Sequence, residues 1–390
     1  MTLIRHLDRY EVAHLNAPTA FVTECVGELD DVALAGAYRM LCQRYPALHG
    51  RVWHDGHGYV LDSTNGAGAR FRSTWMEDDG YPRDIAAEWD VGHSLSAVIV
   101  ERQQGKRARV ALYLDHCVGD GKHMYALCKL LWRLYADIVA GTRIATPLLP
   151  PSLPDPPLTV LSDRLGAACS APTLAGPVSA ALPTLRYRRS LLTAADTAAL
   201  VSRARAAGVS VYGLLAAAVV GGQRALLGEM SPTTIWAVVD LRARVEPQVG
   251  PTDTTNFASA VTVEATSTGV VPVARDVRAT VLAAIADREP HHNMLDDSVG
   301  DAMNYPRANL GAAIVSNLGA VPELTASPDL SIADFWIWPY GWRQRYPMYM
   351  ASTYGGRLGI DMVFRADVYD DPTVDKVVDA VTSELTAARV

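Results

Sequence analysis

The chain has 390 residues, of which 49 % are hydrophobic and 20 % are charged, and its formal net charge is -7. This length suits one large domain or two domains of moderate size, and the apolar content excludes a disordered chain. The acidic balance, with no basic run, argues against a protein built to hold a nucleic-acid backbone.

The five cysteines are odd in number and form no CxxC pair. This usage favours reduced thiols in a cytoplasm over a disulfide framework. The first residues, MTLIRHLDRYEVAH, carry scattered charges and lack the apolar core of a signal peptide. No apolar run reaches the ~18 uncharged residues of a membrane span. We therefore expect a cytoplasmic protein without a transmembrane segment.

The first half of the chain predicts a mixture of strands and helices. Alternating and β-branched residues predict strands over residues 20–26, 50–54, 58–61, 95–101 and 107–115. Asp30 is expected to cap a helix over residues 31–45, which Pro46 ends. Between residues 109 and 139 the apolar period changes from two to that of a helix. His116 should therefore stand where a strand ends, and Asp120 and Gly121 where a helix begins.

Composition shifts after this helix. Residues 141–185 are rich in Pro, Gly and Ala, which predicts an extended crossover with one short helix near residues 159–169. The second half predicts strands over residues 185–191, 235–240, 258–264 and 311–316, and a hairpin over 347–354 and 358–364. Helices are expected from Thr193 or Asp196 to about 207, from Ser210 to about 223–227, and over 272–288 and 372–388.

The pattern His116-x-x-x-Asp120-Gly121 is the strongest chemical signal in the chain. A histidine at a strand end can project its imidazole into a channel and act as a general base near neutral pH. An aspartate four residues later can turn away and anchor the turn by pairing with an arginine. The local pattern fits equally well a partly buried histidine followed by an ordinary aspartate N-cap.

Several segments together resemble the acyltransferase superfamily of nonribosomal peptide condensation domains, chloramphenicol acetyltransferase and plant BAHD enzymes, and most of all the polyketide-associated acyltransferases. The matching segments follow the family's order along the chain. They are QRYPAL at 43–48 with Arg51 and Val52, DHCVGDG at 115–121 (for HHxxxDG), VDLR at 239–242 with Pro247, Gly250 and Asn256, VSNLG at 315–319, and TYGGRL at 353–358. They extend over nearly the whole chain.

The resemblance implies an α+β (mixed α/β) fold of two chloramphenicol-acetyltransferase-like subdomains in a V shape with a central tunnel. Residues 1–145 would form the N-terminal subdomain with the HxxxDG motif, 146–184 a Pro-rich crossover, and 185–390 the C-terminal subdomain. His116 matches the catalytic histidine. Asp120 matches the structural aspartate, with Arg44 as the first choice for its arginine partner and Arg242 as the second.

Other residues are implied by the same resemblance. Beside Gly121 in the motif, the candidates for the substrate tunnel are Asp240, Asn256, Ser316, Asn317, Gly319, Tyr354 and Trp338. The implied reaction moves an acyl group from a coenzyme A or acyl-carrier-protein thioester to a hydroxyl or amine of a lipid or secondary metabolite. No bound cofactor or metal is implied, and a carrier protein or polyketide synthase is a possible partner.

The sequence departs from the family where Asp115 replaces the first motif histidine. Strand alternation turns Asp115 away from the face of His116, so we expect catalysis to survive. The alternative reading is a condensation-like protein without acyl transfer, either a platform for a carrier protein or a fold reused for another proton transfer.

The remaining candidates have ordinary structural explanations. His54, His57, His291 and His292 lack a paired metal-ligand spacing and are expected on surface loops. Cys117 is expected to be a small buried residue. His123 is expected on a helix surface, with an orientation back towards the site as the alternative. Trp336, Trp338, Tyr340 and Trp342 are expected to pack in a core, with an acceptor pocket as the alternative.

Overall fold

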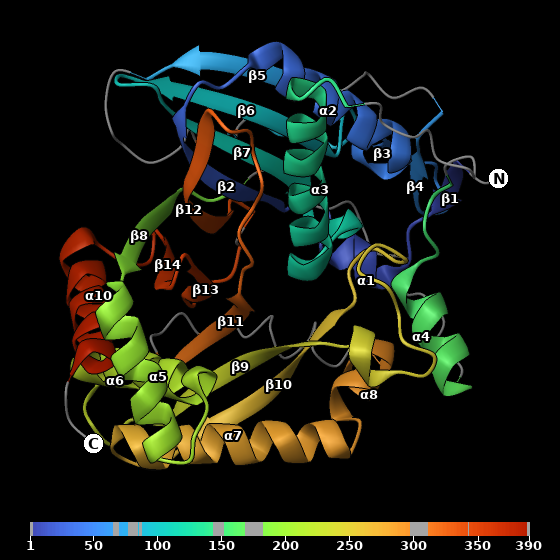
Figure 1. The fold of residues 1–390 in the computed structure, drawn as a ribbon. Helices are drawn as coiled ribbons and strands as arrows, with labels where there is room; N and C mark the ends of the chain where they lie inside the picture. The colour runs from blue at the N-terminus through green and yellow to red at the C-terminus, as the bar shows by residue number, and fades with distance from the viewer. Residues whose placement is uncertain are drawn as a thin grey trace. The chain divides into compact units, whose positions relative to one another are not determined.

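Helices and strands are mixed along the whole chain (Figure 1). The computed structural model describes residues 3–64, 70–76, 85, 88–142, 152–167, 182–296, 311–341 and 343–387. Two compact units form: Met1–Leu182 with Arg242–Phe257 and Pro322–Gly341, and Pro183–Leu241 with Ala258–Val321 and Trp342–Val390. The predicted α+β class is confirmed. The V shape, the tunnel and the division at 145 and 185 stay predictions.

The described residues of the first unit form two sheets. A three-stranded antiparallel sheet has the order β1 (Ile4–His6), β4 (Tyr59–Asp62), β3 (Arg51–His54). A five-stranded sheet has the order β12 (Leu330–Pro339), β2 (Pro18–Gly27), β7 (Arg107–Asp115), β6 (Ser96–Gln103), β5 (Arg70–Trp75). Only the β5–β6 pair of this sheet is parallel. The sheet thus combines strands from both ends of the sequence, and its central strand β7 leads directly to His116.

The helices of the first unit are α1 (Arg9–Ala13), α2 (Asp31–Arg44), α3 (Gly121–Val139) and α4 (Pro157–Leu165), with short 3-10 turns η1 (Pro46–His49), η3 (His116–Val118) and η4 (Arg242–Arg244). Helices α2 and α3 lie side by side in front of the five-stranded sheet (Figure 1). The apolar stripe of α3 is buried at Met124, Leu127, Leu131 and Leu134. Burying such side chains stabilises the fold by ~1.5–3 kcal/mol each.

The second unit holds one six-stranded sheet and five helices among its described residues. The strand order is β10 (Ala258–Ala265), β9 (Thr233–Asp240), β11 (Ala312–Ala320), β13 (Met348–Tyr354), β14 (Arg357–Arg365), β8 (Leu185–Leu191). The helices are α5 (Ala194–Ala206), α6 (Val211–Leu227), α7 (Val270–Ala286), α8 (Glu289–Asp296) and α10 (Asp371–Thr386). Helix α6 packs against both α7 and α10. A Cβ atom at Gly222 would lie 2.5 Å from the Val381 side chain, so glycine permits this close approach to α10.

Most predicted elements are present with small shifts at their ends. Asp30, Thr193 and Ser210 cap helices as expected, each accepting a backbone N–H with its side chain. The short helix of the crossover is α4, while residues 143–151 and 168–181 lie outside the described part. The elements β1, β5, β12, α1 and α8 were not predicted.

Among the described residues no single helix is long and apolar enough to cross a membrane. Taken together, helices α5 and α6 reach that length and apolar content, but the pair is bent by 102° at its break.

Candidate active site

His116 stands at the change from strand to helix. Strand β7 ends at Asp115, the turn η3 follows, and α3 begins at Gly121. The backbone N–H of His116 donates to the Ala17 carbonyl (3.1 Å), which ties the turn to the start of β2. The His116 side chain is half-buried. A rigid strand and a long helix therefore fix the backbone while part of the imidazole is accessible.

Within the described part of the chain, Asn256 and His14 lie beside the His116 imidazole. Asn256 Nδ2 lies 3.2 Å from His116 Nδ1. The His14 ring lies 4.9 Å from the His116 ring, centre to centre, at the end of α1. His14 Nδ1 donates to the Tyr10 carbonyl (2.8 Å), since a carbonyl can only accept. Burial, followed by the neighbouring His116, lowers the pKa of His14 to about 3, so His14 is neutral near pH 7.

Asp120 forms a buried ion pair with Arg242. Arg242 Nη1 donates to Asp120 Oδ2 at 2.5 Å, and the Phe257 N–H donates to the same oxygen at 2.6 Å. Burial by itself would raise the pKa of Asp120, but the Arg242 guanidinium and the donated N–H groups outweigh it and hold that pKa below its ordinary value. Asp120 is therefore a carboxylate in this structure.

The first-choice pairing of Asp120 with Arg44 is wrong. Arg44 ends α2 as an exposed residue, and its guanidinium lies 6.0 Å from the centre of the Tyr45 ring. The second choice, Arg242, is the partner. Arg242 lies in η4, 122 residues after Asp120, so the pairing depends on how the chain folds back.

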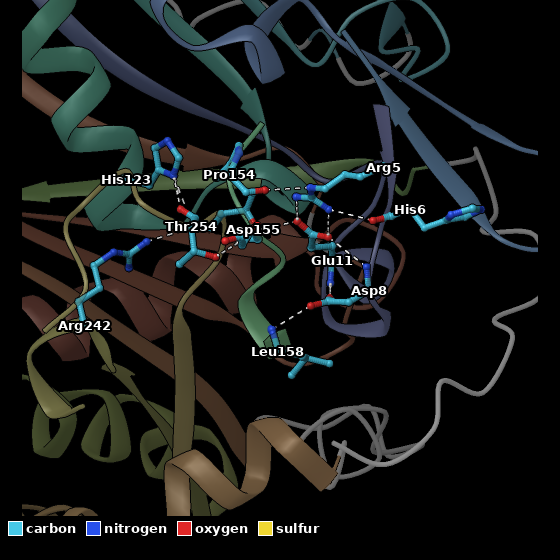
Figure 2. Close-up of polar contacts among 11 residues, drawn as sticks. Arg5, His6, Asp8, Glu11, His123, Pro154, Asp155, Leu158, Arg242 and Thr254 are labelled. Atoms are coloured by element: carbon cyan, nitrogen blue, oxygen red, sulfur yellow. Dashed lines mark hydrogen bonds and ion pairs between the residues drawn. The ribbon is translucent and has the colours of Figure 1, made fainter. Parts of the chain in front are cut away.

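A network of hydrogen bonds holds the segment that carries Asn256. Thr255 Oγ1 donates to Glu11 Oε1 (2.7 Å), and Arg5 donates to both oxygens of Glu11 (2.6 and 2.7 Å). The Thr255 carbonyl accepts from Arg242 Nη2 (3.0 Å). Figure 2 shows Arg5 and Glu11 on one side of Thr254 and Arg242 on the other. The N-terminal helix α1 and the turn η4 thus fix the position of Asn256.

His123 belongs to this network, which corrects its expected position on the helix surface. Its side chain is 5 % exposed, and Nδ1 donates to the carbonyls of Thr254 (3.0 Å) and Thr255 (3.4 Å) (Figure 2). Burial lowers the pKa of His123 and outweighs the opposing effect of Asp120. A neutral His123 therefore acts as a structural donor.

Asp115 is fully buried beside His116. Its Oδ2 accepts from the Ala17 N–H (3.0 Å) and from Trp89 Nε1 (2.8 Å), and its Oδ1 accepts from the Cys117 N–H (3.2 Å). Burial raises the pKa of Asp115 although hydrogen bonds from the Cys117 side chain and from these N–H groups oppose the rise. Cys117 is buried as expected, and burial raises the pKa of its thiol, so it is a poor nucleophile.

The remaining candidates belong to other elements. Trp338 is 1 % exposed in β12 of the first unit, with its ring 6.0 Å from that of Trp336 and 6.2 Å from that of Tyr340, centre to centre, which agrees with core packing. The second unit contains the other five. Asp240 ends β9, Ser316, Asn317 and Gly319 lie in β11, and Tyr354 ends β13. Trp342 lies outside the described residues.

Asn317 and Gly319 shape an irregularity in β11. Asn317 Oδ1 accepts from the Gly319 N–H (2.8 Å), and the register with β13 shifts between Asn317 and Ala320. Gly319 has φ of +83°, a conformation that favours glycine. The family-like segment at residues 315–319 therefore contains a turn that the Asn317 side chain stabilises, together with a register shift within β11.

The other histidines divide into exposed and buried positions. His54, His57 and His292 are exposed. His291 is 1 % exposed in α8, so its expected place on a surface loop is wrong. No group of three His, Cys, Asp or Glu residues in the described ranges is arranged to hold a metal ion.

Sequence reasoning missed three residues of this region: His14, Glu11 and Thr255. The only local signal was the capping box of α1, Asp8 followed by Glu11. That signal predicts a helix start at Asp8. It does not predict that Glu11 would also bind Thr255, which is 244 residues away.

The chain is similar in sequence to known transferases. Residues 182–363 match the family model for the C-terminus of phthiocerol/phthiodiolone dimycocerosyl transferases. A phthiocerol/phthiodiolone dimycocerosyl transferase from Mycobacterium sp. (strain JLS) is 28 % identical over 343 residues, which are 78 % of each chain. The Mycobacterium ulcerans (strain Agy99) protein of the same name is 26 % identical over 351 residues, 83 % of this chain and 82 % of that one.

Solved structures share the fold over almost the full length. Polyketide synthase associated protein 5 from Mycobacterium tuberculosis superposes with a TM-score of 0.79 at 24 % identity, covering 99 % of this chain and 98 % of that one. The first condensation domain of the CDA synthetase gives 0.71 at 14 %, covering 98 % and 96 %. Trichothecene 15-O-acetyltransferase from Fusarium sporotrichioides gives 0.72 at 12 %, covering 99 % and 96 %. The predicted resemblance is confirmed: the chain is similar in sequence to phthiocerol/phthiodiolone dimycocerosyl transferases, and its fold is similar to that of polyketide synthase associated protein 5 and of a condensation domain.

Proposed function

We propose that this protein transfers an acyl group from a thioester to a hydroxyl or amine of a lipid or secondary metabolite, with His116 as the general base. The observation that carries the proposal is the surroundings of His116. This half-buried residue has Nδ1 within hydrogen-bond distance of Asn256, and it lies four residues before Asp120, which pairs with Arg242. The names of the relatives support acyl transfer to a lipid. Coenzyme A or a carrier protein as donor, and a cytoplasmic location, are parts of the proposal.

The reaction is a direct transfer. His116 Nε2 accepts the proton of the acceptor hydroxyl or amine while its oxygen or nitrogen attacks the thioester carbonyl. The C–S bond of the tetrahedral intermediate then breaks, and the imidazolium returns the proton to the thiolate. The products are one ester or amide and one free thiol, so no bond between protein and acyl group forms. General-base catalysis of this kind contributes ~10²–10⁴-fold in rate.

Asn256 selects the tautomer that this mechanism needs. For Nε2 to accept a proton, the proton of the neutral ring must lie on Nδ1. The amide of Asn256 adjoins Nδ1, and rotation of its side-chain amide presents either Nδ2 or Oδ1 there. In the reacting state Oδ1 accepts from Nδ1–H, and the same bond stabilises the imidazolium.

The ion pair of Asp120 and Arg242 positions the residues around His116. Asp120 Oδ1 accepts from the N–H groups of Lys122 and His123 at the start of α3, so the pair links that helix to η4. Catalysis by position is sensitive to small errors, since a shift of ~1 Å can cost ~10²-fold. The pair holds His116 and Asn256 at the distance that the proton transfer requires.

The test is mass spectrometry of the products and of the intact protein. The purified protein is mixed with a panel of acyl-coenzyme A and acyl-carrier-protein thioesters and with long-chain alcohols, diols and amines. We expect an ester or amide to form with release of thiol, and the mass of the intact protein to stay unchanged during turnover. An acylated protein that transfers its acyl group to the acceptor would contradict direct transfer. Thioester hydrolysis with every acceptor would contradict the transferase function.

A further inference from the structure

The carboxylate of Asp115 connects three segments at the end of the five-stranded sheet. It accepts one N–H from Ala17, before β2, one from Cys117, after His116, and the indole N–H of Trp89. Asp115 is 0 % exposed, so these three donors take the place of water. Bonds from N–H groups to a carboxylate are about twice as strong as neutral ones.

The Asp115 side chain acts where the pairing of β2 with β7 ends. Pro18 stands opposite Asp115 in the register, but the Pro18 carbonyl accepts from Gly341 and the Asp115 N–H donates to Leu95, so these two residues exchange no backbone bond. The side chain of Asp115 instead takes the N–H of the preceding residue, Ala17. The carbonyl of Ala17 accepts the N–H of His116 (3.1 Å). One residue, Ala17, is thus bonded through its N–H to Asp115 and through its C=O to His116.

Ala17 is also held from the end of β12. The Gly341 N–H donates to the Pro18 carbonyl (3.0 Å), and a Cβ atom at Gly341 would lie 2.1 Å from the Ala17 Cα atom. Ala17 follows His14 by three residues, so the same anchor limits where the His14 ring lies beside His116. The segment before β2 is therefore bonded both to the end of β7 and to the residue after β12.

We propose that Asp115 is a positioning residue, which fixes the backbone on both sides of His116 and so aims its imidazole at the acceptor. It acts through the N–H groups of Ala17 and Cys117 and touches no substrate. A histidine, which the related motif has at this position, offers one acceptor nitrogen when neutral, whereas the Asp115 carboxylate serves three donors. This inference rests on the proposed role of His116.

The test compares Asp115→Asn with a matched control. Asparagine keeps the shape but has only one acceptor oxygen, so it loses bonds at its Nδ2 end. Asp90→Asn is the control, because Asp90 is an exposed aspartate in the adjoining loop that accepts one backbone N–H, from Gly92 (2.8 Å). We expect Asp115→Asn to lower kcat by ~10–10²-fold with KM for the thioester within about twofold. Asp90→Asn should keep the parental kcat.

His116→Ala is measured in parallel to separate two failures. If His116→Ala is inactive while Asp115→Asn keeps the parental kcat, or loses activity through KM alone, the positioning role is wrong and the proposed function stands. If His116→Ala turns over normally, the proposed function itself fails. Should Asp115→Asn not fold, Asp115→His replaces it: a partial kcat with native circular dichroism supports the role, and the full parental kcat overturns it.

Discussion

At the scale of single residues, the two carboxylate oxygens of Asp120 bond to different segments of the chain. Oδ1 caps α3 by accepting from Lys122 and His123, and Oδ2 accepts from Arg242 and from the Phe257 N–H. One side chain therefore sets both the start of the helix and its distance from η4. Because the pair is buried, removing one partner leaves a charge without compensation.

Arg242→Met should lower the free energy of unfolding by ~3–5 kcal/mol, since the buried Asp120 carboxylate loses its cation. The double variant with Asp120→Asn should recover part of this loss because no buried charge is left. Denaturant unfolding measures both. Arg44→Met is the matched control, and because Arg44 is exposed its effect should lie within ~0.5 kcal/mol. An Arg242→Met variant as stable as Arg44→Met would contradict the pairing.

At the scale of elements, the short helix α1 is joined to α4 through Asp8. Asp8 Oδ1 caps α1 by accepting from Glu11, and its Oδ2 accepts from the Leu158 N–H (2.9 Å) at the start of α4. Burial and the nearby Glu11 carboxylate raise the pKa of Asp8 to about 7, although Arg5 opposes this rise. The element that carries His14 and Glu11 therefore contains a carboxyl group that titrates near neutral pH.

Asp8→Asn should change how stability depends on pH. Between the ordinary pKa of ~3.9 in the unfolded chain and about 7 in the folded protein, the folded state holds a proton that the unfolded state has released. The parent should therefore lose stability as pH rises from about 4 to 7, a loss that Asp8→Asn lacks. The stability of the variant relative to the parent should rise over this window and then level off.

Urea unfolding at a series of pH values measures this difference. Asp30→Asn is the matched control, because Asp30 caps α2 from an exposed position. Curves for Asp8→Asn and the parent that stay parallel from pH 4 to 8 would show that Asp8 does not titrate as described.

The sequence predicted those helices and strands that neighbouring residues mark by caps or by apolar periodicity. The cap residues Asp30, Thr193 and Ser210 mark helix starts because each bonds to an N–H within three residues. Strand β12 gave no such signal, because Phe335 to Pro339 are buried on both faces and show no alternation. Its partner β2 lies about 300 residues earlier, so nothing nearby in the sequence indicates the pairing.

The residues of the candidate site were likewise predicted where the signal is local and missed where the contacts are distant in sequence. His116 and Asp120 form a motif four residues apart and were predicted together with the resemblance. The partner of Asp120 was ranked wrongly. Arg44 was preferred because it lies in the same half of the sequence as Asp120, whereas the fold places Arg242 against Asp120. His14 and Thr255 were missed because their contacts with His116 and Glu11 join segments far apart in the chain.

At the scale of the whole molecule, the first unit is not continuous in sequence. It takes Arg242–Phe257, which carries the partner of Asp120 and the neighbour of His116, and Pro322–Gly341, which contains β12. The first half alone therefore lacks both the ion pair and an edge strand of the five-stranded sheet.

A fragment of residues 1–184 should not melt cooperatively, because β2 loses its pairing with β12 and Asp120 is left buried without Arg242. Near-ultraviolet circular dichroism during heating measures this. The full chain is the control and should show a single sharp loss of signal for this unit. A fragment that melts as sharply as the full chain would contradict the shared architecture.

The central claim is that His116 is the base of acyl transfer, and the most direct measurement is kcat/KM of His116→Ala with the best thioester and acceptor. We expect a loss of ~10²–10⁴-fold, with a melting temperature like that of the parent. His57→Ala, at an exposed turn, should keep full activity. A His116→Ala variant that folds and turns over at the parental rate would contradict the account.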